Sequence, residues 1–263
     1  MGLLIVLVAL AYLTDYDYIL KGIRVVYFTG HTTAFIDDHV YFENEKMPAS
    51  KQPQPWEVHK EFNLVSATER LNKTHNTFGT TAFLIIKNDS IWHEYYVEGY
   101  SPTSQTNSFS IAKSITSALL GKAIFDGYID GLDQDVGDFI PKYQNTNLTV
   151  GDLSSMASGL NWDESYTSPF SITARSYFDD DLAETILGLE VVETPGTAFK
   201  YLSGNTQLLA IVLEKATGKN LEEYLSESFL NCNSSIDFSF SHYRFSFTFL
   251  FYFFVIFLSC YSY

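Results

Sequence analysis

Ser110 and Lys113 lie three residues apart in the segment Ser110-Ile111-Ala112-Lys113. Residues at this spacing share one face of an α-helix, so we expect the Lys113 amine to lie within reach of the Ser110 hydroxyl. A serine becomes an effective nucleophile when a neighbouring base takes its proton. Of the 12 lysines in the chain, Lys113 alone has a serine three positions before it. The pair therefore predicts nucleophilic catalysis by Ser110, with Lys113 as the general base.

A helix over residues 110–126 is predicted to position this pair, and Gly127 marks its end. Four apolar side chains recur along it at the helical period: Ile111, Ile115, Leu119 and Ile124. We expect this apolar surface to shield Lys113 partly from water, and burial favours the uncharged form of an amine. The alternative is that Ser110 is an ordinary N-cap serine, which many helices carry.

The composition limits the classes of function. The chain has 263 residues, of which 46% are apolar and 18% charged, as in a globular protein with one sizeable core. The formal net charge of -15 leaves no basic surface for phosphates, so nucleic acid is not an expected partner. The histidines show no His-x-His or His-x-x-x-His spacing, and both cysteines lie in the last 33 residues. We therefore expect neither a metal site nor a cofactor.

Other segments predict the elements around the helix. Residues 80–87 and 91–97 read as two strands joined by a turn at Asn88-Asp89. A short helix is expected after Leu148, with Thr149 or Asp152 as its cap. Farther along, two helices are expected in succession. The first carries the apolar residues from Leu208 to Ala216 and stops at Gly218, and the second begins at Asn220-Leu221.

The N-terminus begins with an apolar run of 11 residues, Leu3 to Leu13. A membrane span needs about 20 such residues, whereas the core of a signal peptide has about 7–15. We interpret residues 1–20 as a signal or retained anchor, which predicts an exported protein that is membrane-anchored, periplasmic or extracellular. The alternative is a buried N-terminal helix. Residues 21–75 are predicted to be an extension or linker, marked by Pro48, Pro53 and Pro55.

The C-terminal tail, residues 231–263, differs in composition from the rest. It holds 9 of the 22 phenylalanines and 7 serines, and it contains no Gly, Pro, Ala, Lys or Glu. Three interpretations are open: a second membrane segment, a β-rich core strand, or sequence that does not belong to the fold. The abrupt change after a regular amphipathic stretch favours the third.

The region from Gly79 to Tyr224 resembles the serine β-lactamase and penicillin-binding superfamily. The branch it resembles is the class C-like one, which includes esterases and 6-aminohexanoate-dimer hydrolases. The segments that carry the resemblance are Ser110 to Lys113, Gly127-Tyr128-Ile129-Asp130, Leu153…Ser158-Gly159-Leu160, Pro195-Gly196-Thr197-x-Phe199-x-Tyr201 and Ala216-Thr217-Gly218-Lys219. The resemblance implies an α/β fold class, more closely an α+β sandwich beside a helical lobe, with the nucleophile helix between them. The domain is expected to span residues 76–230.

The resemblance also implies a role for Tyr201. The pattern Tyr-x-[Ser/Asn] occurs at Tyr143, Tyr166, Tyr201 and Tyr224. Only Tyr201 has the preceding Pro-Gly turn and the following helix of the family, so it is the expected catalytic tyrosine; the alternative is a packing tyrosine. The second motif of the family is Tyr-x-Asn, whereas this chain has Ser203 in third place, as in the aminohexanoate-type branch. Ser203 and Asn205 are the expected substrate-binding residues, and the alternative for Ser203 is a turn residue.

The third motif of the family, Lys-Thr-Gly or His-x-Gly on an edge strand, is missing from this sequence. In the family that strand supplies half of the oxyanion hole, the other half being the backbone N–H of the nucleophile. We therefore expect a partial domain that lacks its closing C-terminal strands.

The expected activity is hydrolysis of a small-molecule ester or amide, such as a β-lactam or a short amide oligomer, through an acyl-enzyme on Ser110. Two alternatives are open. One is a catalytically inactive, truncated homologue that acts as a membrane-anchored binding protein. The other is a penicillin-recognising peptidase of the cell wall. Besides the substrate, the expected partner is a membrane, bound through residues 1–20; if the tail is a second membrane segment, it binds there as well.

Overall fold

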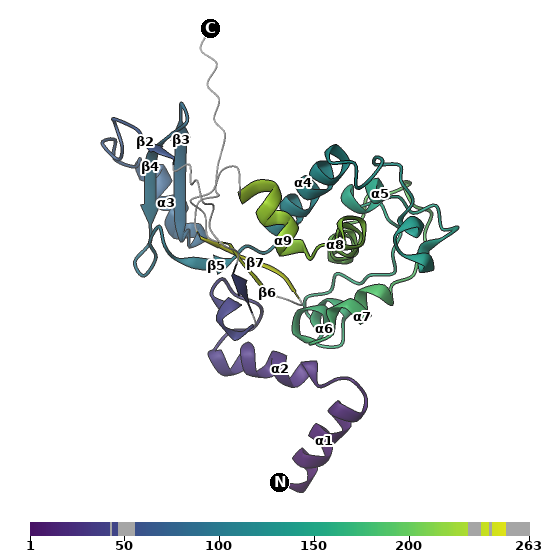
Figure 1. The fold of residues 1–263 in the computed structure, drawn as a ribbon. Coiled ribbons are helices and arrows are strands. Elements are labelled where there is room, and N and C mark those ends of the chain that lie inside the picture. Colours follow the sequence, from purple (N-terminus) through teal and green to yellow (C-terminus); the bar gives the residue numbers. More distant parts are fainter. Residues whose placement is uncertain (43, 47–55, 231–237, 242–243, 251–263) are drawn as a thin grey trace.

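The computed structural model describes residues 1–42, 44–46, 56–230, 238–241 and 244–250. Strands and the short helix α3 (Glu69–Phe78) lie on one side of the molecule, and helices α4 to α9 lie on the other (Figure 1). This mixture of sheet and helical lobe agrees with the predicted α/β class. Pro48, Pro53 and Pro55, which marked the predicted linker, lie outside the described residues.

The first sheet has three strands in the order β2-β4-β3. Strands β3 (Ala82–Lys87) and β4 (Ser90–Tyr96) are antiparallel, and β2 (Glu57–Val58) pairs in parallel with β4. Asn88 and Asp89 both have positive φ, 52° and 57°, which the tight two-residue turn of a hairpin requires. The two predicted strands and their turn are confirmed.

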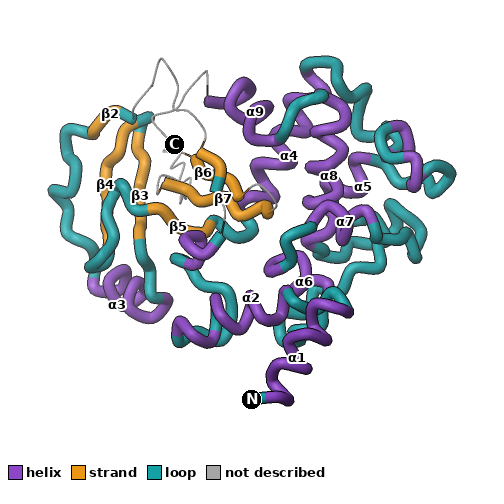
Figure 2. The backbone as a smooth tube through the Cα atoms, turned by 60° about the horizontal axis from the view of Figure 1, so that its bottom comes forward, coloured by secondary structure: helices purple, strands orange, loops and turns teal. Residues whose placement is uncertain are grey.

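The second sheet has the order β1-β6-β7-β5 and is antiparallel throughout. It joins β1 (Glu45–Lys46) and β5 (Gln105–Asn107) to two segments of the tail, β6 (Phe238–Ser241) and β7 (Arg244–Leu250). The described part of the tail is therefore strand (Figure 2). Strand β5 matters for the site because the chain passes from its end directly to Ser110.

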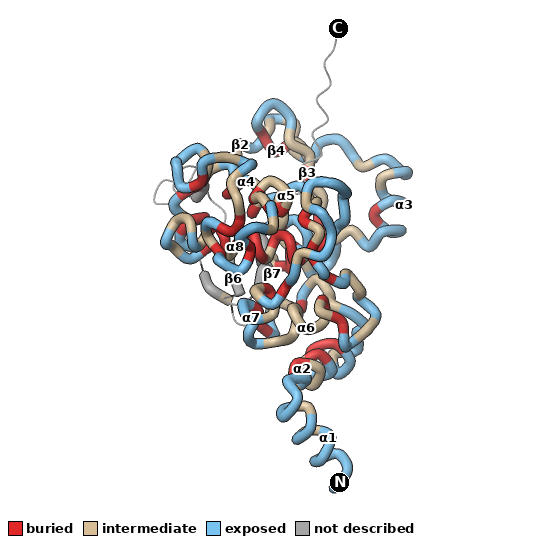
Figure 3. The backbone as a smooth tube through the Cα atoms, turned by 90° about the vertical axis from the view of Figure 1, so that its right-hand side faces the viewer, coloured by how far each residue is buried: buried red, intermediate tan, exposed pale blue. Residues whose placement is uncertain are grey.

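The helical lobe packs around α4 (Ile111–Phe125) and α8 (Ser203–Thr217). The other α-helices of the lobe are α5 (Val150–Ser154), α6 (Ile172–Phe178), α7 (Leu182–Leu187) and α9 (Leu221–Leu225). Single turns occur as η1 (Tyr27–Thr29), η2 (Asp38–Tyr41), η3 (Val136–Asp138), η4 (Pro141–Tyr143) and the π-turn η5 (Ser226–Leu230). Buried residues concentrate around α4, α5 and α8 (Figure 3).

Helix α4 has the predicted bounds, but its buried face differs from the predicted apolar stripe. The buried residues are Ala112, Thr116, Leu119, Leu120 and Ala123. Ile111 is exposed, and Ile115 and Ile124 are only partly buried against the core. Three of the five buried positions carry the smaller side chains Ala112, Thr116 and Ala123, and α4 packs against α8. Of the four residues of the predicted stripe, only Leu119 is fully buried.

The predicted helix ends agree with the observed caps. Thr149 and Asp152 form a reciprocal capping box at the start of α5. Helix α8 ends at Gly218, which has a φ of 69°, and Asn220 caps α9 through the backbone N–H of Glu223.

The N-terminal helix α1 (Gly2–Leu13) projects away from the remainder of the molecule and buries none of its residues (Figures 1 and 3). The alternative of a buried N-terminal helix was therefore wrong. Within the described residues no single helix has the length and apolarity of a membrane span, although α1 combined with residues Tyr18–Thr29 passes that test as a pair bent by 118°. Anchoring through residues 1–20 stays a prediction. Helix α2 (Tyr18–Val25) runs across the predicted boundary at residue 20 and packs on α6, with Gly22 against Phe178.

Gly159 offers a test of how tightly the helical lobe is packed. Its φ is 70°, and a Cβ at this position would lie 2.2 Å from the backbone oxygen of Glu193. We expect Gly159→Ala to lower the free energy of unfolding by more than about 3 kcal/mol, because strain and a backbone clash add together. Gly127 is the matched control, since its φ is 78° and no atom lies within 4 Å of such a Cβ. Gly127→Ala should cost only about 1 kcal/mol. Urea unfolding of the two variants measures the difference, and equal losses would contradict the packing described.

Candidate active site

Ser110 stands at the N-cap position of α4 but does not use its side chain as a cap. Instead, its hydroxyl oxygen accepts hydrogen bonds from two other side chains. The Lys113 Nζ donates over 3.3 Å, and the Tyr201 hydroxyl donates over 2.6 Å. The interpretation of Ser110 as an ordinary N-cap serine is thereby excluded in this structure. The structure brings together the three residues that the sequence predicted as catalytic.

Lys113 lies one helical turn beyond Ser110 and is half-buried. Its Nζ also lies 5.1 Å from the centroid of the Tyr201 ring. The Lys113 amine therefore lies close to both Ser110 and Tyr201. Each of these three side chains contacts the other two.

Tyr201 reaches this cluster because the loop before it is tied to the end of α5. The backbone N–H of Gly196 donates to the oxygen of Ala157, and that of Lys200 donates to Met156. Immediately after Tyr201, Leu202 is 1% exposed and forms the N-cap residue of α8. Anchors on both sides fix the position of a tyrosine that is itself 41% exposed.

The residue before the nucleophile has an unusual backbone conformation. Phe109 has a φ of 45°, in the left-handed region that bulky residues seldom adopt. Its backbone N–H donates to the Asn107 Oδ1 over 2.8 Å. The amide nitrogen of Asn107 in turn donates to Asp38, which is fully buried and also accepts from the Tyr177 hydroxyl at 2.6 Å. This buried network holds the strained turn that presents Ser110. No pattern in the sequence predicted this network.

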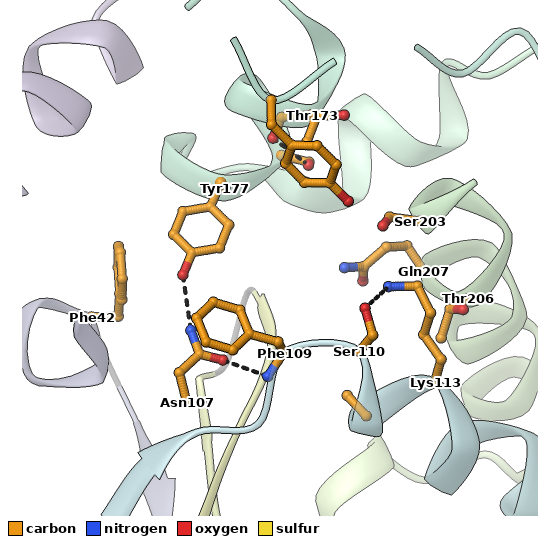
Figure 4. Close-up of a pocket in the computed structure, with 13 residues that line it drawn as sticks. Phe42, Asn107, Phe109, Ser110, Lys113, Thr173, Tyr177, Ser203, Thr206 and Gln207 are labelled. Carbon is orange, nitrogen blue, oxygen red and sulfur yellow. Dashed lines mark hydrogen bonds between the residues drawn. The ribbon is translucent and has the colours of Figure 1, made fainter. Parts of the chain in front are cut away.

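Ser110 and Lys113 line a pocket of about 130 Å³ (Figure 4). Asn107, Phe109 and Tyr177 lie to one side of Ser110, and Lys113, Thr206 and Gln207 lie to the other (Figure 4). The pocket is small, so it accommodates the reacting bond of a substrate and little more.

Ser203 lines this pocket as predicted, but its polar groups are engaged with Glu164. Its backbone N–H donates to one carboxylate oxygen over 2.6 Å, and its hydroxyl donates to the other over 2.5 Å. The Tyr166 hydroxyl also donates to Glu164. Partial burial, aided by this hydrogen bond, raises the pKa of Tyr166 to about 12, so Tyr166 remains a neutral phenol near pH 7. Glu164 therefore holds Ser203 and Tyr166 in place, and no pattern in the sequence predicted this role.

Asn205 does not reach the pocket. It is 0% exposed, its side-chain oxygen accepts from the Ser158 hydroxyl at 2.5 Å, and its amide nitrogen contacts the Met156 sulfur. Gln207 lies in the pocket instead, and its Oε1 has no hydrogen-bond partner among the described residues. Because α8 already begins at Ser203, residue 207 shares a helix face with residue 203, whereas residue 205 points to the opposite side. The i, i+4 spacing between Ser203 and Gln207 predicts that both side chains lie on one helix face, and it would have identified Gln207 as a pocket residue.

The Ser110 backbone N–H has no hydrogen-bond partner among the described residues and is available as one donor of an oxyanion hole. Across the same described part of the chain, no three His, Cys, Asp or Glu side chains are grouped so that they would hold a metal ion.

Comparison with known proteins points to one family. Residues 65–233 match the family model described as Beta-lactamase. The 6-aminohexanoate-dimer hydrolase of Paenarthrobacter ureafaciens is 29% identical over 160 residues, which cover 56% of this chain and 41% of the relative. Protein flp of Staphylococcus aureus (strain MRSA252) is 26% identical over 166 residues, which cover 57% of this chain and 32% of the relative. The chain therefore spans less than half the length of these curated relatives.

A solved structure supports the fold assignment. The structure described as a putative 6-aminohexanoate-dimer hydrolase from Bacillus anthracis superposes with a TM-score of 0.61 at 18% identity. The superposition covers 80% of this chain and 63% of that protein. The family model spans more than half of the 263 residues and includes Ser110, Lys113 and Tyr201. The chain belongs to the beta-lactamase family.

Proposed function

We propose that the protein is a serine hydrolase that cleaves a small-molecule ester or amide through an acyl-enzyme on Ser110. The observation that carries the proposal is the convergence of Lys113 Nζ and the Tyr201 hydroxyl on the Ser110 Oγ, at 3.3 and 2.6 Å. The Tyr201 distance lies within the range of about 2.6–3.2 Å for direct proton transfer, and the Lys113 distance lies just beyond it, as is common for catalytic contacts that tighten when substrate binds. The name of the Paenarthrobacter ureafaciens relative, a dimer hydrolase, supports hydrolysis as the reaction class.

In the first step, the Ser110 Oγ attacks the substrate carbonyl carbon, and the uncharged Lys113 amine takes the hydroxyl proton. The new Oγ–C bond forms as the carbonyl oxygen takes the negative charge, facing the Ser110 backbone N–H. The bond from the carbonyl carbon to the leaving oxygen or nitrogen then breaks. Tyr201 gives its proton to the leaving group and recovers one from the Lys113 ammonium, whose Nζ lies beside it.

In the second step, a water molecule attacks the acyl carbon. Tyr201 takes a proton from this water as it passes its own proton to the Lys113 amine. The bond to Ser110 Oγ breaks, and the Lys113 ammonium returns a proton to the serine oxygen. The acid leaves, and the enzyme returns to the arrangement of the resting site. No group outside the three side chains and water is needed to balance either step.

The role of Tyr201 predicts a specific kinetic change. We expect Tyr201→Phe to lower kcat for p-nitrophenyl acetate by about 10²-fold, the lower part of the range for general acid–base catalysis, because the deacylating water loses the phenol that relays its proton while Lys113 and Ser110 remain. Slower deacylation should also make the stoichiometric burst of p-nitrophenolate easier to observe. Stopped-flow absorbance measures both quantities.

Tyr128 provides the matched control, because it is 40% exposed, close to the 41% of Tyr201, and does not line the pocket. Tyr128→Phe should leave the burst and the steady-state rate unchanged. If Tyr201→Phe kept the wild-type rate, the Tyr201 hydroxyl would have no part in the reaction.

A further inference from the structure

We propose that a second cavity beside the serine pocket binds the uncharged, apolar acyl chain of the substrate. This inference rests on the proposed function, since it assigns the substrate class of that site. The cavity has a volume of about 620 Å³, several times the 130 Å³ of the serine pocket. Small-molecule sites in proteins have volumes of about 300–1,000 Å³, so the second cavity alone has room for most of a ligand.

The two cavities adjoin. Four residues line both of them: Phe109, Tyr166, Thr173 and Tyr177. Phe109 directly precedes Ser110 in the chain, and the rings of Phe109 and Tyr177 lie on the same side of the serine (Figure 4). An acyl group attached to the Ser110 Oγ that extends past Phe109 therefore passes into the larger cavity.

The wall that the two cavities share offers an apolar surface to a ligand, because its hydroxyl groups are already hydrogen-bonded. Its three hydroxyls all donate to acceptors of the protein itself. Tyr166 donates to Glu164, Thr173 donates to the backbone oxygen of Asp163 over 2.6 Å, and Tyr177 donates to Asp38 over 2.6 Å. Because these hydroxyls are already paired, contact with an alkyl chain leaves none of them unsatisfied.

The far side of the cavity comes from α2, α6 and the segments around residues 32–34 and 165–169. Helix α2 contributes Ile19 and Ile23, and its C-cap residue Val26 also lines the cavity. Among the residues that the structure describes, no Asp, Glu, Lys, Arg or His lines the cavity. A charged group at the end of the acyl chain would lose hydration there and would meet only neutral hydroxyl groups and no opposite charge from these residues, which is unfavourable. The cavity therefore selects a neutral alkyl or aryl chain over one that ends in an ammonium or carboxylate.

The first experiment compares p-nitrophenyl acetate, butyrate and octanoate on the whole protein. Each buried methylene contributes up to about fourfold to kcat/KM, and we expect at least about a 10²-fold rise from acetate to octanoate. The p-nitrophenyl ester of 8-aminooctanoic acid has a similar length but ends in an ammonium group. We expect its kcat/KM to fall to within about tenfold of the acetate value. Turnover with no dependence on length, or equal use of the two eight-carbon esters, would overturn the inference.

Variants of the cavity wall sharpen this test. Ile23 lines the cavity and is 37% exposed, so Ile23→Asp places a carboxylate in it with little risk to folding. We expect this variant to lower the octanoate-to-acetate ratio at least about tenfold. Phe28→Asp is the matched control, because Phe28 is 81% exposed and does not line the cavity. Its ratio should equal that of the wild type. Ala34→Trp, which fills the cavity from another segment, should lower the ratio as well.

A binding measurement separates this inference from the proposed chemistry. The methyl ketone 2-decanone carries an eight-carbon chain and is not hydrolysed. Isothermal titration should give at least about tenfold weaker binding to Ile23→Asp than to wild type and Phe28→Asp. If 2-decanone binds in this way but no ester is cleaved, the proposed hydrolysis fails and the cavity assignment survives. If esters are cleaved at Ser110 but 2-decanone binds equally to all three proteins, the cavity assignment fails alone.

Discussion

Ser110→Ala is expected to lower kcat/KM for p-nitrophenyl acetate at least about 10³-fold, because loss of a nucleophile removes the covalent pathway entirely. Both hydrogen bonds that hold the cluster together end on the Ser110 Oγ. The variant should also lose the burst of p-nitrophenolate. Stopped-flow and steady-state absorbance at one substrate concentration measure both effects.

The control for this change lies on the same helix. Ser114 is exposed and does not line the pocket, so Ser114→Ala removes a hydroxyl of the same kind without touching the cluster. We expect Ser114→Ala to keep wild-type kinetics. Equal losses in the two variants would mean that the effect comes from the helix and not from a nucleophile.

Lys113→Met should have the second largest effect, a loss of about 10²–10⁴-fold in kcat/KM, since a positioned general base contributes about this much. Methionine keeps the length and the apolar stem of lysine and removes only the amine. The Ser110 hydroxyl would remain in hydrogen-bond contact with Tyr201 but would lose the neighbouring base. Far-ultraviolet circular dichroism should be unchanged, because the Nζ contributes one hydrogen bond at 3.3 Å and no core packing.

Lys122→Met tests whether any lysine on α4 would give the same result. Lys122 is on the same helix but pairs with Asp126 and does not line the pocket. We expect its kcat/KM to stay within about twofold of wild type, as surface ion pairs contribute little. If Lys113→Met also retained wild-type activity, the amine would have no part in the reaction.

The sequence predicted the parts of the fold that depend on local signals. The hairpin at Asn88-Asp89, the capping box of α5 and the end of α8 at Gly218 all follow from residues within one turn of each other. Lys113 was likewise predictable, because its distance from Ser110 is fixed by the helix that contains both. The placement of Tyr201 beside them, 91 positions along the chain from Ser110, needed the family resemblance.

The remaining parts of the site depend on contacts between distant segments. Asp38 and Asn107 are 69 positions apart, and nothing near either residue indicates that they share a buried hydrogen bond. The second cavity unites α2 with α6, which are about 150 residues apart in the chain, so no periodicity or motif could reveal it. The prediction that Asn205 binds substrate was wrong because the helix was expected to begin after residue 205, whereas α8 begins at Ser203. Within this helix, residue 205 points away from the face that carries Ser203.

Peptide mapping of a covalent adduct tests the central claim most directly. The wild-type protein is incubated with a fluorophosphonate probe, digested, and analysed by tandem mass spectrometry. The account predicts one adduct, on Ser110, which is absent from Ser110→Ala, retained in Ser114→Ala and formed much more slowly by Lys113→Met. An adduct on another residue, or equal labelling of Ser110→Ala and wild type, would contradict it.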